Sequence, residues 1–329
     1  MRVHIIALML LSLIAGGCNA GSSSKSADET PVVAQRNAKQ QFSADSAYRY
    51  VKQQVEFGPR VPGTDSHVDC ARFLTAELSR HGADTVIEQK TVVTAFNGDR
   101  LPIINILGRY NLNASRRVLL VAHWDTRPWA DAEKDVSKHS TPIPGANDGG
   151  SGVGVLLEIA RNLKLESPAV GVDILLTDAE DYGNTGGDDD SWCLGTQYWV
   201  KNMPYNQGNL PIYGILLDIV GGIDAKFYRE YFSEYYAQPV NDKVWAVAAS
   251  SGFGEKFINT RQGAVTDDHV YINAAGIPCI DIIECANQAT GSFPPTWHTL
   301  ADDMRSIDKS SLKAVGQTVL NTIYQEPNN

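Results

Sequence analysis

Acidic side chains and histidines stand at or near the ends of short apolar runs throughout this sequence. Carboxylates gathered around a histidine repel one another unless a cation neutralises them. Zn²⁺ accepts oxygen and imidazole nitrogen as ligands, and its catalytic sites combine three protein ligands with one open position. The sequence therefore predicts a metal site. The residues concerned are His123, Asp148, Glu180, Asp181, Asp218 and His298.

Each of these residues also has a purely structural explanation. Asp148 could cap the helix that follows it, because side-chain oxygens accept hydrogen bonds from the first free N–H groups of a helix. Glu180 and Asp181 could belong to a solvated turn, and His123 could be a hydrogen-bonded core histidine. A functional site is favoured because all of these explanations would have to hold at once.

The runs that precede the polar clusters are typical of strands buried on both faces. The four most continuous runs are 118–122, 172–176, 213–217 and 278–283. Further strands are expected at 85–96 and 103–109, and helices at 44–57, 66–79, 152–163, 192–201, 240–250, 267–273 and 309–324. This order predicts an α/β three-layer sandwich, in which helices flank a central, mixed but mostly parallel β-sheet. Ligands bind beyond the carboxyl ends of strands in such sheets, so the polar clusters should converge there.

Composition narrows the class of protein further. The chain has 329 residues, of which 43% are hydrophobic and 20% are charged, so it can bury a large core. Its formal net charge of −10 argues against nucleic-acid binding, which requires a basic face. No internal repeat or second domain boundary is visible, and residues 41–329 are expected to form a single catalytic domain.

The first residues have the pattern of an export signal. Arg2 precedes an apolar run at 5–14, which is too short to span a membrane, and small residues at 15–17 precede Cys18. We expect residues 1–17 to be a signal peptide and 18–40 to be a flexible tether with a lipid on Cys18. The alternative is simple cleavage after Ala20. The mature protein is then expected in the periplasm as a monomer, with the lipid as its only membrane contact.

Six ordered motifs resemble the zinc aminopeptidase-like superfamily, and within it the type II glutaminyl cyclases (glutaminyl-peptide cyclotransferases). The resemblance covers roughly residues 45–325, and each motif alone is weak, whereas the ordered set is specific for the superfamily. The last two motifs favour the cyclase branch. The motifs are Ala122-His123-Trp124-Asp125, Gly145-Ala146-Asn147-Asp148, Asp178-Ala179-Glu180-Asp181, Leu217-Asp218-Ile219-Val220-Gly221, Asp267-Asp268-His269 and, within Phe293-Pro294-Pro295-Thr296-Trp297-His298-Thr299, Trp297-His298-Thr299.

The resemblance implies one zinc ion per monomer, held by Asp148, Asp181 and His298. Cyclases more often carry glutamate at position 181, and the shorter aspartate would shift the metal or the backbone. The resemblance also implies catalytic and substrate-binding residues. The catalytic group is Glu180 as general acid/base, with Asp218 and Asp267 in its hydrogen-bond network, and the aromatic walls of the substrate pocket are Trp192, Phe293 and Trp297.

The implied reaction converts an N-terminal glutaminyl residue of a peptide or protein to pyroglutamate and releases ammonia. Zinc would polarise the γ-carbonyl, and Glu180 would move a proton from the attacking amine to the leaving nitrogen. The first alternative is a two-zinc aminopeptidase, in which His123, Asp148 and Asp218 hold the second ion. The second is a binding module without activity, which is disfavoured because every catalytic position is filled.

Two features stay open at the level of sequence. The acidic run Asp188, Asp189 and Asp190 could be a solvated loop, part of the substrate entrance, or a Ca²⁺ site. Four cysteines remain beyond residue 18 and contain no CxxC pair, so buried free thiols are expected. They are Cys70, Cys193, Cys279 and Cys285.

Overall fold

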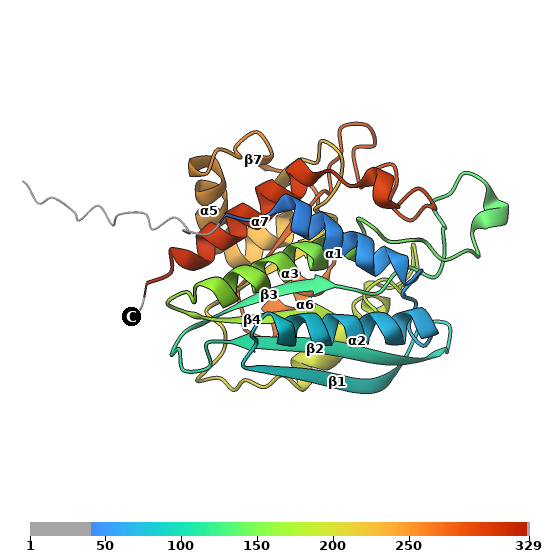
Figure 1. Cartoon of the computed structure of the whole chain (residues 1–329). Helices are drawn as coiled ribbons and strands as arrows, with labels where there is room; N and C mark the ends of the chain where they lie inside the picture. Colours follow the sequence, from blue (N-terminus) through green and yellow to red (C-terminus); the bar gives the residue numbers. More distant parts are fainter. Residues whose placement is uncertain (1–40, 328–329) are drawn as a thin grey trace, which may run out of the picture. The chain divides into compact units, whose positions relative to one another are not determined.

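The computed structural model describes residues 41–327, in which a six-stranded sheet lies between helices (Figure 1). The strand order is β1-β2-β4-β3-β5-β8. The strands β3 (Arg117–His123), β4 (Gly171–Thr177), β5 (Tyr213–Asp218) and β8 (Cys279–Ile283) are parallel, whereas β1 (Thr85–Thr94) and β2 (Arg100–Tyr110) extend one edge in antiparallel pairing. The predicted α/β sandwich with a mostly parallel sheet is confirmed.

Helices cover both faces of the sheet. The larger layer contains α1 (Ala44–Glu56), α2 (Asp65–Arg80), α3 (Gly150–Leu165), α5 (Tyr231–Ser250) and α7 (Lys309–Tyr324), and the smaller layer contains α4 (Leu194–Lys201) and α6 (Asp268–Ala274). Strand β3 alternates between the two cores: Leu120 packs with the first layer, and Leu119 and Val121 pack with the second. This explains why its sequence is continuously apolar.

Close packing of α3 against the sheet brings the start of this helix to the strand ends. A Cβ atom on Gly152 would lie 2.2 Å from the carbonyl oxygen of Leu217, at the end of β5. Gly149 precedes the helix with a φ of +82°, and a Cβ atom there would lie 2.4 Å from the carbonyl oxygen of Asp125. These two glycines let the segment that carries Asp148 approach the carboxyl ends of β3 and β5.

Some element boundaries differ from those predicted. Helix α5 begins at Tyr231 and not at residue 240, and it is kinked at Ala237, two residues before Pro239. Helix α4 begins at Leu194, because Asp189–Ser191 form the 3-10 turn η2. The short strands β6 (Phe227–Arg229) and β7 (Phe257–Arg261) form a separate parallel pair that the sequence did not predict. Two further 3-10 turns are η1 (Val136–Lys138) and η3 (Met304–Ser306).

The described part of the chain bears on two other expectations. No helix within residues 41–327 is long and apolar enough to cross a membrane. The four cysteines at positions 70, 193, 279 and 285 are free and buried, as expected. The predicted signal peptide, Cys18 and the tether lie outside the described residues.

Candidate active site

A cavity of about 530 Å³ opens at the carboxyl ends of the parallel strands. All nine residues to which the resemblance assigned a role line this one cavity, although they come from segments up to 150 residues apart in the sequence. They are Asp148, Glu180, Asp181, Trp192, Asp218, Asp267, Phe293, Trp297 and His298. Their convergence is a property of the parallel sheet, since its strands all end at the same edge.

One group of possible metal ligands consists of Asp148, Asp181 and His298, all buried. Nε2 of His298 lies 3.1 Å from Oδ1 of Asp181 and 3.6 Å from Oδ2 of Asp148. The ligand atoms of a tetrahedral zinc site lie roughly 3.3 Å apart, given bonds of about 2.0–2.1 Å. Oδ2 of Asp148 and Oδ2 of Asp181 are buried without a hydrogen-bond donor. The donor types, their spacing and these two unpaired oxygens therefore fit a divalent metal such as zinc.

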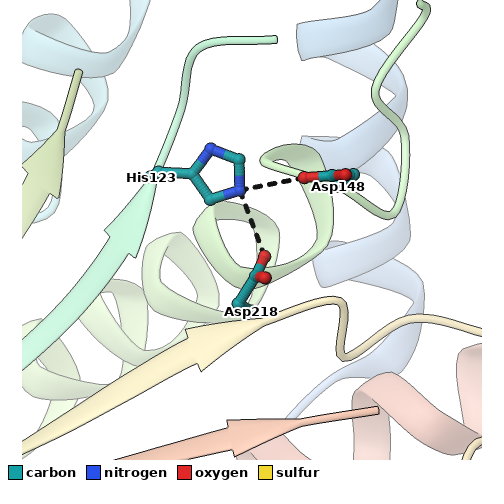
Figure 2. A group of neighbouring side chains, drawn as sticks. All are labelled: His123, Asp148 and Asp218. Carbon is teal, nitrogen blue, oxygen red and sulfur yellow. Dashed lines mark hydrogen bonds and ion pairs between the residues drawn. The ribbon is translucent and has the colours of Figure 1, made fainter. Parts of the chain in front are cut away.

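A second group of possible ligands lies beside the first and shares Asp148 with it. It consists of His123 at the end of β3, Asp148 in the loop before α3 and Asp218 at the end of β5 (Figure 2). Nε2 of His123 lies 3.1 Å from a carboxylate oxygen of each acid. Asp148 directs Oδ1 toward His123 and Oδ2 toward His298. The donor sets of both the one-metal and the two-metal hypotheses are thus present.

Glu180 occupies the part of the cavity next to the first donor set. It belongs to a third cluster of possible ligands with Cys193 and Asp267, and the Cys193 thiol lies 3.3 Å from its Oε1. Burial, together with the carboxylates of Asp267 and Asp181, raises the pKa of Glu180 well above its usual value. A raised carboxyl pKa is what general acid/base catalysis near neutral pH requires.

Other acids extend this cluster into the sheet. Burial raises the pKa of Asp218 to about 6, and burial together with neighbouring Asp218 and Asp268 raises the pKa of Asp267 well above its usual value. Asp281, in the middle of β8, is fully buried with both carboxyl oxygens unpaired, and its pKa is also raised by burial and by Asp267. Because the pKa values of these carboxyl groups are raised, the cluster carries less negative charge than the number of its acids implies. Their titrations are coupled, because the groups lie close together.

Aromatic rings form one wall of the cavity. The rings of Phe293 and Trp297 stack with centroids 4.6 Å apart, and Trp297 stacks on His298 at 3.5 Å. The ring of Trp192 is nearly parallel to His298 at 6.1 Å. Aromatic rings therefore pack on and beside His298, the histidine among the candidate metal ligands.

The backbone around the site adopts conformations that are costly for residues other than glycine. Positive φ values near 50° occur at Ala179, Cys193, Ile219 and His298, each of which belongs to or adjoins the residues of the cavity. Such left-handed residues cost on the order of 1–3 kcal/mol each and persist only where the surroundings hold them. The site geometry is therefore imposed by the fold around it.

Two buried acids that sequence reasoning left without a role hold the segments that carry the candidate ligands. Asp125 accepts hydrogen bonds from the backbone N–H groups of Glu180 and Asp181, both at 3.2 Å. Asp302 accepts bonds from the N–H groups of Asn147 and Asp148, at 2.9 and 3.0 Å. Asp125 stands in a recognised motif, whereas no local pattern marks Asp302.

A buried arginine that the sequence analysis also missed connects several parts of the site. Arg127 makes two hydrogen bonds to the carboxylate of Asp131, at 2.8 and 2.7 Å, and Oδ1 of Asp131 lies 3.3 Å from Nδ1 of His298. Arg127 also donates to the carbonyl oxygen of Asp181 at 3.0 Å, and its guanidinium lies 4.8 Å from the ring centre of Trp192. Burial alone would raise the pKa of Asp131, but the bonds from Arg127 and His298 lower it well below its usual value.

The acidic run at 188–190 lies beside the cavity. Asp189 lines it and accepts a hydrogen bond from Thr266 at 3.2 Å, and Asp190 accepts one from Tyr271 at 3.2 Å. Among residues 41–327, the three clusters with metal-ligand spacing do not include this run. Within the run, Asp189 is thus the residue that lines the cavity.

Comparison with known proteins adds to this geometry. Residues 105–323 match Peptidase family M28. The crystal structure of Bacteroides thetaiotaomicron glutaminyl cyclase bound to N-acetylhistamine is 51% identical, with a TM-score of 0.84 over 88% of this chain and 99% of that one. Tannerella forsythia glutaminyl cyclase is 50% identical, with a TM-score of 0.84 over 88% and 100%.

A curated relative carries a different name. The aminopeptidase YwaD of Bacillus subtilis is 27% identical over 68% of this chain, and the match spans 44% of that protein, which is less than half its length. The family match covers most of the sheet and every candidate ligand. The chain belongs to peptidase family M28.

Proposed function

We propose that this protein is a glutaminyl-peptide cyclotransferase, which converts N-terminal glutaminyl residues of peptides and proteins to pyroglutamate with release of ammonia. The observation that carries the proposal is the position of Glu180: it is a half-buried carboxyl of raised pKa, beside a metal donor set, in a cavity with aromatic walls. The similarity to two glutaminyl cyclases, at 51% and 50% sequence identity, supports the same conclusion.

We further propose that Asp148, Asp181 and His298 hold one zinc ion per chain. Zinc bound there supplies a Lewis acid that polarises the γ-carbonyl of the substrate glutamine. Arg127 and Asp131 hold the ring of His298 in place from its other nitrogen, and Asp125 fixes the backbone of Asp181. Ligands that are oriented in this way bind metal with less loss of side-chain freedom.

The residues of the cavity have separate tasks in the reaction. The α-amino nitrogen of the substrate attacks its own γ-carbonyl carbon, a new C–N bond forms, and the bond to the side-chain nitrogen breaks. Glu180 takes a proton from the attacking amine and gives one to the departing nitrogen, which leaves as ammonia. Asp267, whose ligand atom lies within 4.8 Å of that of Glu180, raises the pKa of Glu180 and so favours its protonated form.

The aromatic walls serve positioning. A glutamine side chain is flexible, and the ring must close through one conformation in which amine and carbonyl meet. Trp192, Phe293 and Trp297 line the cavity and restrict the side chain to folded conformations, which is a proximity effect. Because the substrate supplies its own nucleophile, no water molecule has to be activated.

The alternative function is a two-zinc aminopeptidase. It is favoured by the intact second donor set of His123, Asp148 and Asp218 and by the similarity to an aminopeptidase. In that reaction water would be the nucleophile that attacks the first peptide bond, and two zinc ions held by these residues would supply its activation. The number of zinc ions and the bond that is broken distinguish the two functions.

The decisive experiment measures both quantities on the purified protein. We expect one tightly bound zinc per chain by elemental analysis, ammonia release from peptides with N-terminal glutamine, and no aniline release from leucine anilide. Two zinc ions together with aniline release and no ammonia would establish the aminopeptidase. Removal of zinc by a chelator should abolish ammonia release, and added zinc should restore it.

Replacement of the proposed base gives a second prediction. Glu180→Gln should lower kcat by about 10²–10⁴-fold, because the proton transfer loses its carboxyl group. Zinc content should stay at the wild-type level, since Glu180 is not one of the three proposed ligands. Glu56→Gln, at an exposed glutamate of α1, is the matched control and should leave kcat unchanged. Full activity of Glu180→Gln would contradict the proposed role.

The support of His298 gives a third prediction. Asp131→Asn removes the charge that faces Nδ1 of His298 and should weaken zinc binding about 10–100-fold, measured by competition with a fluorescent chelator. Asp303→Asn is the control, since Asp303 forms a comparable paired contact with Arg305 on the exposed surface. Equal zinc affinities in the two variants would show that Asp131 does not position the ligand.

We also propose that the chain is exported and held at a membrane through a lipid on Cys18, with residues 41–329 acting as a monomeric periplasmic catalytic domain. The sequence of residues 1–18 supports this proposal. Cys18→Ser should abolish incorporation of labelled fatty acid in cells and move the protein from the membrane fraction to the soluble one. Unchanged labelling would show that the lipid is elsewhere.

A further inference from the structure

In the first part of helix α5, polar side chains are buried and aromatic side chains are exposed, which is the opposite of the usual arrangement. Ser233 and Glu234 are buried, whereas Tyr231, Tyr235 and Tyr236 are 51%, 70% and 46% exposed. Glu234 is held inside by ion pairs with two arginines. Large aromatic rings gathered on the surface beside a buried polar face are typical of a binding surface.

The three exposed tyrosines and the half-buried Phe232 form one continuous group, which we call the aromatic patch: Tyr231, Phe232, Tyr235 and Tyr236. Tyr235 packs edge-on against Tyr236 with ring centres 4.8 Å apart, and Tyr236 stacks on Phe232 at 6.3 Å. Tyr231 contacts both Phe232 and Tyr235. The kink at Ala237 separates the residues of the patch from the remainder of α5.

The aromatic patch is continuous with the active-site cavity. Phe232 lines the cavity, together with the segment 264–266. Two hydrogen bonds fix the start of α5 to this segment: Tyr231 N–H donates to the Gly263 carbonyl at 3.1 Å, and Val265 N–H donates to the Glu230 carboxylate at 3.1 Å. Since Glu230 also caps α5, the rings are held in a fixed position relative to the cavity.

We propose that the aromatic patch binds apolar side chains of the peptide substrate downstream of its N-terminal glutamine. The inference rests on the proposed function, because it takes the N-terminal glutamine to occupy the cavity. A peptide that leaves the cavity past Phe232 meets Tyr236 and then Tyr235. An extended chain advances about 3.3–3.6 Å per residue, so about three residues span the steps between these rings. The patch therefore has room for about three consecutive residues of the substrate downstream of the glutamine.

Two other occupants are conceivable for exposed aromatic rings: a second copy of the chain and a lipid surface. The substrate is favoured because Phe232 belongs to both the patch and the cavity. Neither a second copy nor a lipid surface requires that continuity. Rings stacked on one another also provide apolar area at low conformational cost, which suits peptides of varied sequence.

The test compares two substrates that differ only where the patch should act. In the wild type, kcat/KM for Gln-Gly-Gly-Leu-Phe-amide should exceed that for Gln-Gly-Gly-Gly-Gly-amide by about tenfold, given the apolar area that Leu and Phe can bury. In the double variant Tyr235→Ala with Tyr236→Ala this ratio should fall to about twofold or less. The matched control is Leu165→Ala, at a 55% exposed residue of α3, which should keep the full ratio.

The remaining outcomes have definite meanings. A ratio near one in the wild type, or one that the double variant preserves, would overturn the inference while leaving the proposed function intact. Loss of dimers in light scattering or of binding to neutral phosphatidylcholine vesicles, with the substrate ratio unchanged, would assign the patch to a second copy or to lipid. If the double variant does not fold, Tyr235→Ala alone, at the most exposed ring, tests the same ratio.

The proposed function can fail separately. No ammonia from either peptide in the zinc-loaded wild type would contradict cyclase activity. The inference about the patch is then tested by fluorescence titration with the same two peptides. Tighter binding of the Leu-Phe peptide that disappears in the Tyr235→Ala and Tyr236→Ala variant would support it, and equal binding would reject it.

Discussion

Mutual repulsion of buried carboxylates is the constraint on which this site depends. Asp148, Asp181 and Asp218 meet at one edge of the sheet, and burial makes their charges costly unless cations or protons offset them. His123 and His298 each contact two of these acids. The space between the acids and the histidines is where a divalent cation is most strongly favoured, and the metal hypothesis follows from the charge balance.

A single carboxylate connects the proposed metal ligand Asp181 with the proposed acid/base group Glu180. Asp125 accepts the N–H groups of both Glu180 and Asp181, which are neighbours in the chain but have different proposed tasks. The left-handed conformation of Ala179 turns the chain at this point so that both side chains line the cavity. The distance between base and metal ligand is therefore fixed by one peptide unit and its hydrogen bonds, and not by two independent loops.

The parallel strands and the polar residues that follow them could be predicted from the sequence, because both depend on patterns among neighbouring residues. The four parallel strands are continuously apolar because both faces are covered, and the polar residues after them converge because the strands are parallel. The first turns of α5 were missed because their inward residues are Ser233 and Glu234, which lack apolar helical spacing. Asp131 and Asp302 were missed because each acts on a partner more than 150 residues away, and no local pattern records such a contact.

Asp148 directs one carboxylate oxygen toward each of the two histidines, so one side chain belongs to both donor sets. This has an evolutionary consequence for the family, in which similar folds carry the names of peptidases and of cyclases. A change between one-metal and two-metal chemistry on this scaffold does not require new ligands or a rearranged backbone. In this chain the two kinds of chemistry would differ in whether the His123 side of the site holds an ion. One unchanged set of side chains is therefore compatible with either chemistry.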